Sequence, residues 1–172
     1  AGIRCELRFW EYPGCYGRIL IELTPLSLIE FYLKYFSCFL IFRRLSSQIE
    51  YLLLQASYGQ HHWSPPKGHV DTGEDDFATA LRETKEETGY SESDLKINKD
   101  ISHTLKYKVK GNPKTVIYWL AELLNPGKEV VLSEEHDNFK WLPKEEAKEL
   151  SGYADMQELI DCFHSKIDEI NN

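Results

Sequence analysis

The sequence contains few cysteines and no excess of positive charge, and both shortages exclude broad classes of protein. The four cysteines among 172 residues show no paired spacing, so we expect free thiols in a reducing compartment and no disulfide framework. The formal net charge of −8 argues against non-specific binding to nucleic acid, and no stable nucleic-acid complex is expected. A polyanionic substrate requires either locally clustered basic residues or a metal that neutralises it.

The sequence also lacks a long uninterrupted apolar run. Residues 19–42 are strongly apolar, but Glu22, Pro25, Glu30 and Lys34 interrupt them. A membrane-spanning helix needs about 20 predominantly apolar residues and rarely carries that many charges. We therefore interpret this segment as a buried or partner-facing helix. Because the first residues show no pattern of a secretory signal, we expect a cytoplasmic protein without membrane association.

The length and apolar content suit one domain with a single large core, since 42% of the 172 residues are hydrophobic. Apolar runs at 39–42 and 49–55 flank a polar turn and predict a hairpin. Alternating apolar residues over 101–109, followed by the apolar run 115–124, predict a second hairpin. An amphipathic repeat over 156–170 predicts a long C-terminal helix.

Residues 68–90 carry the strongest functional signal. Thr72 and Gly73 precede an acidic first turn, which is typical of a helix start, and Gly89 is placed to end that helix in the left-handed conformation. The apolar stripe at helical spacing consists of Phe77, Ala80, Leu81, Thr84 and Thr88.

Three carboxylates lie on one face of this predicted helix. Glu83, Glu86 and Glu87 are spaced i, i+3 and i+4, in the last turns, where the helix dipole disfavours negative charge. Such crowding indicates a counter-charge, and a hard divalent cation prefers oxygen ligands. A solvated acidic face with an Arg82–Glu86 pair is the simpler alternative. It leaves the fixed positions of two glycines and Glu74 unexplained.

The segment resembles the signature of the Nudix hydrolase family, the Nudix box. Gly68, Glu74, Arg82, Gly89 and the three glutamates stand in register, whereas Thr84 replaces an aliphatic residue. Residues 61–69, 114–121 and 132–136 are similar to the animal branch of asymmetrical diadenosine tetraphosphate hydrolases. The resemblance covers residues 38–165. That branch tolerates threonine at the Thr84 position, but it often has proline in place of Thr72 and histidine in place of Glu134.

The resemblance implies a Nudix-fold α/β/α sandwich with a mixed central sheet. It implies Mg²⁺-dependent hydrolysis of diadenosine tetraphosphate to ATP and AMP by attack of water on a phosphorus, with Mn²⁺ as an alternative metal. The expected partner is a small dinucleoside polyphosphate, and the expected state is a monomer. The alternatives are hydrolysis of another nucleoside or inositol polyphosphate, including capped RNA ends, and a non-catalytic nucleotide sensor.

The resemblance also assigns the metal and catalytic residues. The expected metal ligands are Glu83, Glu86, Glu87 and the backbone carbonyl of Lys67. Arg82 is expected to orient the glutamates through charge-assisted hydrogen bonds, and Glu74 to support the loop. The residue that helps to deprotonate the water is Glu83 or a carboxylate beside it. Glu135, which lies outside the box, matches an extra glutamate that serves as base or metal ligand, and which glutamate is the base is left open.

Substrate contacts are expected from cations and aromatic side chains. The residues matched for this role are His62, Lys67, Tyr107, Lys110, Lys114 and Tyr153. For Lys110 and Lys114, an ordinary solvated surface is an equal alternative, and for Tyr107 a place in the core competes.

Residues 1–37 read differently from residues 38–172, the expected Nudix hydrolase domain. Leu28, Ile29, Tyr32, Phe36 and Phe39 follow a weak helical pattern, but residues 5–37 match nothing in the family. The segment is interpreted as an atypical apolar extension or insertion: a docking arm, a loosely ordered extension or translated non-coding sequence. We expect that deletion of residues 1–36 leaves an active hydrolase.

Overall fold

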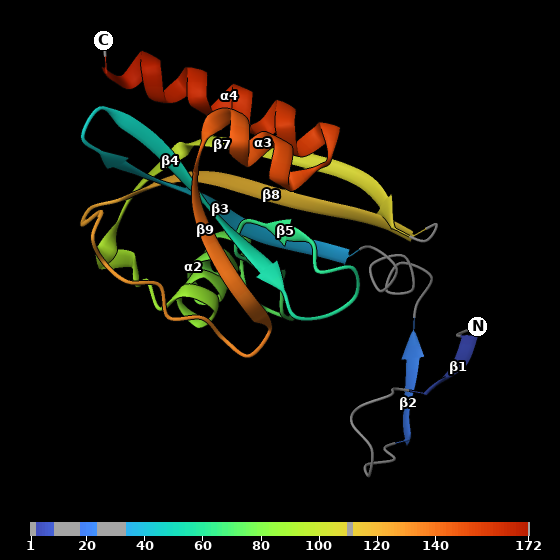
Figure 1. Cartoon of the computed structure of the whole chain (residues 1–172). Helices are drawn as coiled ribbons and strands as arrows, with labels where there is room; N and C mark the ends of the chain where they lie inside the picture. Colours follow the sequence, from blue (N-terminus) through green and yellow to red (C-terminus); the bar gives the residue numbers. More distant parts are fainter. Residues whose placement is uncertain (1–2, 9–17, 24–33, 110–111, 172) are drawn as a thin grey trace.

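The computed structural model describes residues 3–8, 18–23, 34–109 and 112–171. A seven-stranded mixed sheet lies between helices on its two faces (Figure 1). This is the α/β/α sandwich with a mixed sheet that the sequence predicted. Among the described residues, no helix has the length and apolar character needed to cross a membrane.

Strands β3 (Lys34–Leu45) and β4 (Gln48–Ala56) form the first expected hairpin. They pair directly only from Phe42 to Leu45, next to the turn at Ser46 and Ser47. Beyond that point the two strands separate. The start of β3 then pairs with β6 (Lys67–His69), and the end of β4 pairs with β5 (Trp63–Ser64).

The second expected hairpin consists of β7 (Leu95–Val109) and β8 (Asn112–Leu123). Strand β8 runs parallel to β3 from Lys34 to Phe42, which makes the sheet mixed. Strand β9 (His136–Pro143) pairs with β4 and brings the segment before it to the end of β4.

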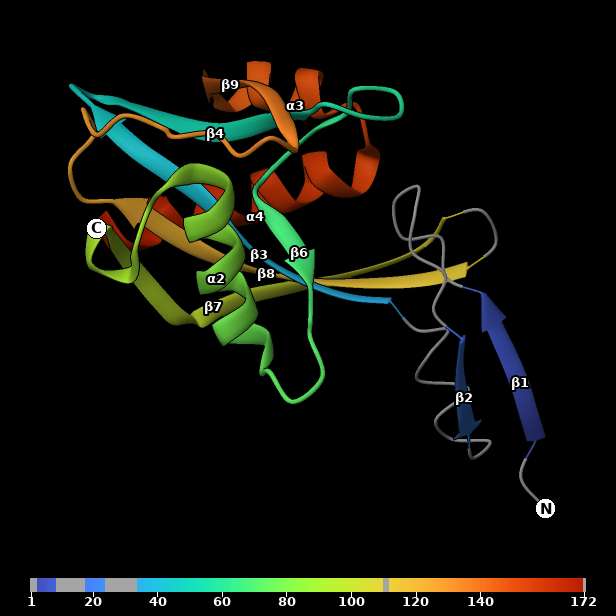
Figure 2. The ribbon, with the colours of Figure 1, turned by 90° about the horizontal axis from the view of Figure 1, so that it is seen from below.

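Helices cover both faces of the sheet. Helix α2 (Asp76–Thr88) lies on one face, and α3 (Lys144–Ser151) and α4 (Ala154–Asn171) lie on the other (Figure 2). The apolar stripe of α2 packs into a core with Phe39 and Ile41, whereas α4 packs over Cys38 and Leu40. Side chains of successive strand residues point to opposite faces, so β3 contributes to both cores.

Helix α2 has the expected C-terminal end but begins later than predicted, because Glu74 and Asp75, expected in its first turn, precede its first residue, Asp76. The side chain of Asp75 caps its start by accepting from the amide of Ala78, and Gly89 ends it in the left-handed region at φ 76°. Glycine adopts this conformation without a Cβ clash. A short 3₁₀ helix, η1 (Glu92–Asp94), then leads into β7.

The helix expected over residues 19–42 is wrong for 19–23, which lie in strand β2 (Arg18–Leu23), and for 34–42, which lie in β3 and include Phe36 and Phe39. The part of the expected helix over 24–33 lies outside the described residues. Strands β1 (Ile3–Arg8) and β2 (Arg18–Leu23), which the sequence did not suggest, pair with each other in a separate two-stranded sheet.

Candidate active site

The carboxylates of α2 line a cavity of about 810 Å³. Glu83, Glu86 and Glu87 project into it from the last turns of the helix, and their exposed fractions are 15%, 58% and 7%. The other lining residues come from the loop after β4 and the segment before β9: Ser57, Tyr58, Ser133, Glu134 and Glu135. The structure therefore brings Glu135 to the three glutamates of the box.

Arg82 connects these carboxylates to the loop before the helix. Its Nη1 donates to Glu83 at 2.6 Å and to Glu86 at 3.3 Å, while Nε and Nη2 donate to Glu74 at 3.0 and 2.9 Å. Nη2 also donates to the carbonyl of His69 at 3.0 Å. The guanidinium thus holds Glu83 through charge-assisted hydrogen bonds.

Glu74 supports the loop, as the sequence suggested. Besides the bonds from Arg82, it accepts from the hydroxyl of Thr79 at 2.6 Å. The hydrogen bonds from Arg82 and Thr79 lower the pKa of Glu74 to about 2, so the carboxylate is charged at neutral pH.

Glu87 is the most buried of the three carboxylates. It accepts from the backbone N–H of Lys67 at 2.8 Å, and burial raises its pKa to about 8, against the opposing effect of the Lys67 charge. The imidazole of His136 lies 3.8 Å from it, and burial lowers the pKa of that ring to about 4. Both side chains are therefore neutral at pH 7 without an added cation.

Glu83 packs directly against the backbone of Gly68. A Cβ at position 68 would overlap its carboxyl group, so only glycine permits this approach. Burial raises the pKa of Glu83, while the hydrogen bond from Arg82 lowers it. Since Gly68 lies in β6, the pairing of β6 with β3 fixes the surface against which Glu83 rests.

The donor set of the cavity fits a hard divalent cation. Glu83, Glu86, Glu87 and Glu135 supply only oxygen ligands, and a cation supplies the charge that buried Glu87 needs in order to ionise. Among the residues that the structure describes, no three acidic, histidine or cysteine side chains form a preformed metal cluster.

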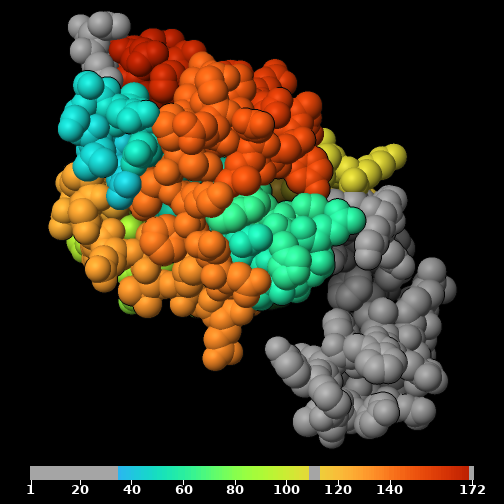
Figure 3. Space-filling model, in the orientation of Figure 1, coloured from blue at the N-terminus to red at the C-terminus, as the bar shows by residue number. Residues whose placement is uncertain are grey.

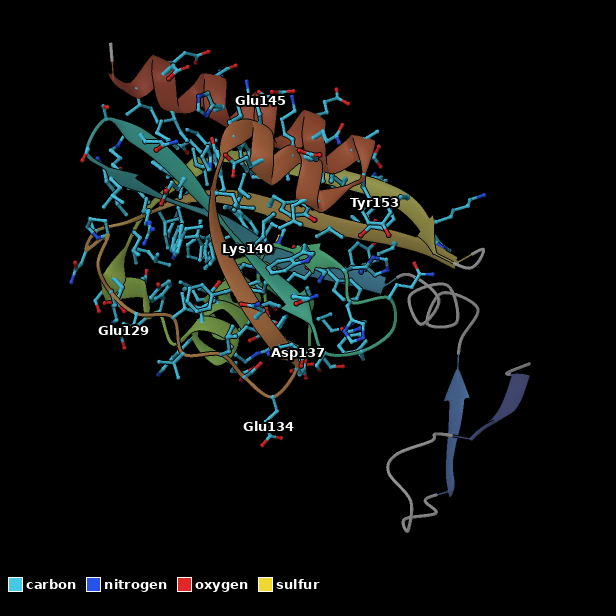
Figure 4. The ribbon with its side chains drawn as sticks, in the orientation of Figure 1. Glu129, Glu134, Asp137, Lys140, Glu145 and Tyr153 are labelled. Atoms are coloured by element: carbon cyan, nitrogen blue, oxygen red, sulfur yellow. The ribbon has the colours of Figure 1, made fainter. Side chains whose placement is uncertain are left out.

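A second cavity, of about 290 Å³, lies on the other side of the loop after β4. It is formed by Gln60, His61, His62, Trp63, Leu150, Ser151, Gly152 and Tyr153. The hydroxyl of Tyr153 lies 3.2 Å from Nδ1 of His62, and the two ring centroids are 5.7 Å apart. Gly152 ends α3 at φ 73°, and Figure 4 shows Tyr153 at the turn that follows. His62 and Tyr153, both predicted to contact the substrate, are therefore within hydrogen-bond distance of each other.

Tyr107 and Lys114 lie at the ends of β7 and β8, directly opposite each other in the register. Tyr107 is half-buried against the core, and burial raises its pKa to about 12, with a smaller effect from Tyr153. The ammonium of Lys67 donates to the hydroxyl of Ser64 at 2.8 Å. Lys110 lies outside the described residues.

The segment before β9 is fixed by the loop after β4. The amide of Ser57 donates to the carbonyl of Glu135 at 2.9 Å, and its hydroxyl donates to that of Glu134 at 3.2 Å. Glu134 lines the mouth of the cavity, but Figure 4 shows its side chain extending away from the protein body. In Figure 3 the loop after β4 lies beside β9 on the surface.

Sequence reasoning missed Ser57, Tyr58, Ser133 and His136. The signal available for Ser57 and Tyr58 was their position at the end of a predicted strand, where a scaffold usually presents functional loops. His136 is the last residue of the segment 132–136, yet only its neighbour Glu135 was assigned a role.

The mixed α/β/α sandwich and the clustered carboxylates of α2 are the arrangement that the resemblance implied, and the comparison with known families identifies it. A family model described as the NUDIX domain matches residues 34–163. The chain belongs to the Nudix hydrolase family. The expected family and fold are thereby confirmed.

Within the family, the chain is similar to several individual proteins. The chain is 53% identical over 123 residues to the asymmetrical bis(5′-nucleosyl)-tetraphosphatase of Caenorhabditis elegans, covering 72% of this chain and 88% of the relative. The protein of the same name from Mus musculus is 51% identical over 119 residues, covering 69% and 81%. A solved binary complex of the C. elegans Ap4A hydrolase matches with a TM-score of 0.77 and 48% identity, covering 79% of this chain and 98% of that one.

Proposed function

We propose that this protein hydrolyses diadenosine tetraphosphate to ATP and AMP in a Mg²⁺-dependent reaction. The observation that carries the proposal is that one loop, residues 57–63, lines both cavities. A carboxylate cavity suited to metal and phosphate therefore adjoins a second cavity with an exposed aromatic side chain, Tyr153, suited to a base. The relatives at about half identity that are named for this activity support the same substrate.

The metal would be held by Glu83, Glu86, Glu87 and the carbonyl of Lys67, with Mn²⁺ as the alternative ion. When bound, the ion supplies positive charge that neutralises phosphate oxygens and makes water easier to deprotonate. The chain itself keeps the ligands in place: Arg82 holds Glu83 and Glu86, and the amide of Lys67 holds Glu87.

Glu83 and Glu135 are the two candidates for the base. The carboxylate accepts a proton from the attacking water as the water oxygen bonds to phosphorus and the bridging oxygen leaves with the other product. The Glu83→Gln and Glu135→Gln variants separate these roles. The variant in which the base is replaced should lose the acidic limb of the pH–rate profile. The variant in which the other glutamate is replaced should keep this limb, at a lower rate.

The lysines and the aromatic residues would bind the rest of the substrate. Lys67 and Lys114, with Lys110, would contact the polyphosphate, and His62, Tyr107 and Tyr153 would hold one adenosine by stacking and hydrogen bonding. Tyr107→Ala combined with Tyr153→Ala is expected to raise KM for a dinucleotide far more than for an inositol polyphosphate. An equal effect on both would contradict base recognition.

Product identification tests the proposal directly. The protein is incubated with diadenosine tetraphosphate and Mg²⁺, and the nucleotides are separated by anion exchange. ATP and AMP in equal amounts are expected, whereas two ADP or no turnover would refute it. Glu87→Gln should lower kcat at least about 10²-fold. Glu129→Gln, at an exposed acid outside the cavity, is the matched control.

We also infer a monomer in an intracellular reducing compartment, with residues before β3 dispensable. Cys38 and Cys162 are free thiols, and burial raises the pKa of the Cys38 thiol. Light scattering and thiol labelling of protein isolated from cells test the first two points. Deletion of residues 1–33, which precede β3, should leave kcat unchanged; a soluble but inactive truncation would contradict dispensability.

A further inference from the structure

The start of β3 contributes an aromatic side chain to the predicted substrate site. Strand β3 begins at Lys34, which is also the first residue that the NUDIX-domain model matches. Phe36 lies two residues before Cys38, so both side chains point to the same face of the sheet. Phe36 is half-buried and packs against the core that contains Cys38 and, at its border, Tyr107.

The ring of Phe36 contacts both Lys114 and His69, the last residue of β6. The ammonium of Lys114 is 3.6 Å from the Phe36 ring centroid and 5.8 Å from that of Tyr107. The ring centroids of Phe36 and His69 are 3.9 Å apart, and the planes of the two rings are tilted by 42°. His69 follows Gly68 and gives its carbonyl to Arg82.

The sheet register produces this arrangement. Phe36 pairs with Val116 of the parallel strand β8 and with His69 of β6. Lys114 lies two residues before Val116, and therefore on the same face as Phe36. The contact is thus fixed by two strand pairings, although the lysine itself is long and flexible.

An aromatic face holds an ammonium in a way that suits phosphate binding. The attraction comes from the ring quadrupole and becomes stronger when the pair is shielded from water. Unlike a carboxylate, the ring adds no negative charge that would repel a polyphosphate. It also restricts the lysine stem before the substrate arrives, which reduces the ordering cost of binding.

We propose that Phe36 is a positioning residue that holds Lys114 in place for the polyphosphate chain of the substrate. The proposal rests on the proposed function, which gives Lys114 its phosphate. It adds a determinant of substrate affinity from the part of the chain that precedes Cys38.

A mutant cycle tests the proposal. Phe36→Leu removes the aromatic face and keeps an apolar side chain, Phe36→Trp restores a face, and Lys114→Met removes the charge. With diadenosine tetraphosphate, Phe36→Leu should raise KM about 3–10-fold with little change in kcat, and Phe36→Trp should recover most of the loss. In the Lys114→Met background, Phe36→Leu should have no further effect.

Two further measurements separate positioning from packing. In the wild-type protein, the ring should shift the side-chain methylene resonances of Lys114 upfield, and Phe36→Leu should abolish that shift. Titration with inorganic tripolyphosphate should show weaker binding for Phe36→Leu and for Lys114→Met, with the larger loss for Lys114→Met, which removes the charge itself. The proposal would be overturned if Phe36→Leu raised KM equally with and without Lys114→Met, or if Phe36→Leu lowered KM. The absence of an upfield shift in the wild-type protein would also overturn it.

The outcomes also distinguish the two proposals. If the wild-type protein does not turn over diadenosine tetraphosphate, the proposed function fails whatever the Phe36 variants do. If the wild-type protein is active but the effects of Phe36→Leu and Lys114→Met multiply, only the role of Phe36 fails. The upfield shift is read on the wild type, so a variant that fails to fold still leaves a decisive measurement.

Discussion

Substituting Gly68 by alanine should abolish most of the activity while leaving the fold intact. A Cβ at position 68 would lie 1.8 Å from Cδ of Glu83, so an ordinary contact at 3.4 Å requires the carboxyl group to move by about 1.6 Å. Because Arg82 holds the carboxylate at 2.6 Å, the displacement also breaks the hydrogen bond that orients it.

The size of the effect follows from that displacement. A misplacement of about 1 Å in a catalytic group can cost about 10²-fold in rate, which corresponds to about 2.7 kcal/mol in the activation barrier. Because the displacement required here exceeds 1 Å, we expect kcat of Gly68→Ala to fall at least about 10²-fold. The midpoint of thermal unfolding should change little, since the carboxylate is a side-chain end that can move towards the cavity.

The assay is steady-state hydrolysis of diadenosine tetraphosphate with saturating Mg²⁺, together with a thermal unfolding curve. Gly127→Ala is the matched control, because the nearest atom to its added Cβ is Oδ1 of Asn125 at an ordinary 3.6 Å. If Gly68→Ala keeps kcat within about twofold of the control, the contact between Gly68 and Glu83 does not position the carboxylate, and the reasoning is refuted.

Three further predictions concern stability and charge. Thr84→Val should raise the free energy of unfolding in urea by about 1 kcal/mol, because the buried hydroxyl of Thr84 has no hydrogen-bond partner among the described residues. A loss of stability would mean that the hydroxyl does form a hydrogen bond. The ion pair with Lys128 at 2.6 Å lowers the pKa of Asp94 to about 2. The contribution of the charged Asp94 to the stability of the fold is therefore complete above about pH 4 and is lost as the pH falls towards 2. Asp94→Asn should therefore lower the unfolding temperature at pH 6 but not at pH 2, and an equal loss at both would contradict the charge pairing. Glu134→His removes a negative charge from the mouth of the carboxylate cavity, so it should lower KM about two- to fivefold at low salt and less at high salt. Glu129→Gln, outside the cavity, should leave KM unchanged. A change in KM that does not depend on salt would contradict a long-range electrostatic effect.

The metal-binding helix was readable from the sequence because its pattern is local. Glu83, Glu86 and Glu87 share a face through the geometry of a single helix, and Gly89 ends that helix through its own backbone preference. No distant contact is needed for either feature. The same holds for the two hairpins, whose strands are close neighbours in the chain.

The start of β3 was misread because local spacing does not select between a helix and a strand there. Phe36 and Phe39 are three residues apart, a separation that fits one face of a helix. In the structure they belong to cores on opposite faces of the sheet. Pairing with β8, nearly eighty residues further along the chain, decides this arrangement.

The sequence by itself determined that a helix carries three clustered carboxylates and that glycines flank it. Only the tertiary structure decided which other groups join them. Glu135 reaches the carboxylate cavity because β9 pairs with β4, and His62 meets Tyr153, 91 residues away, at the end of α3. Helical periodicity is a property of a few consecutive residues, whereas such meetings depend on the packing of the whole sheet.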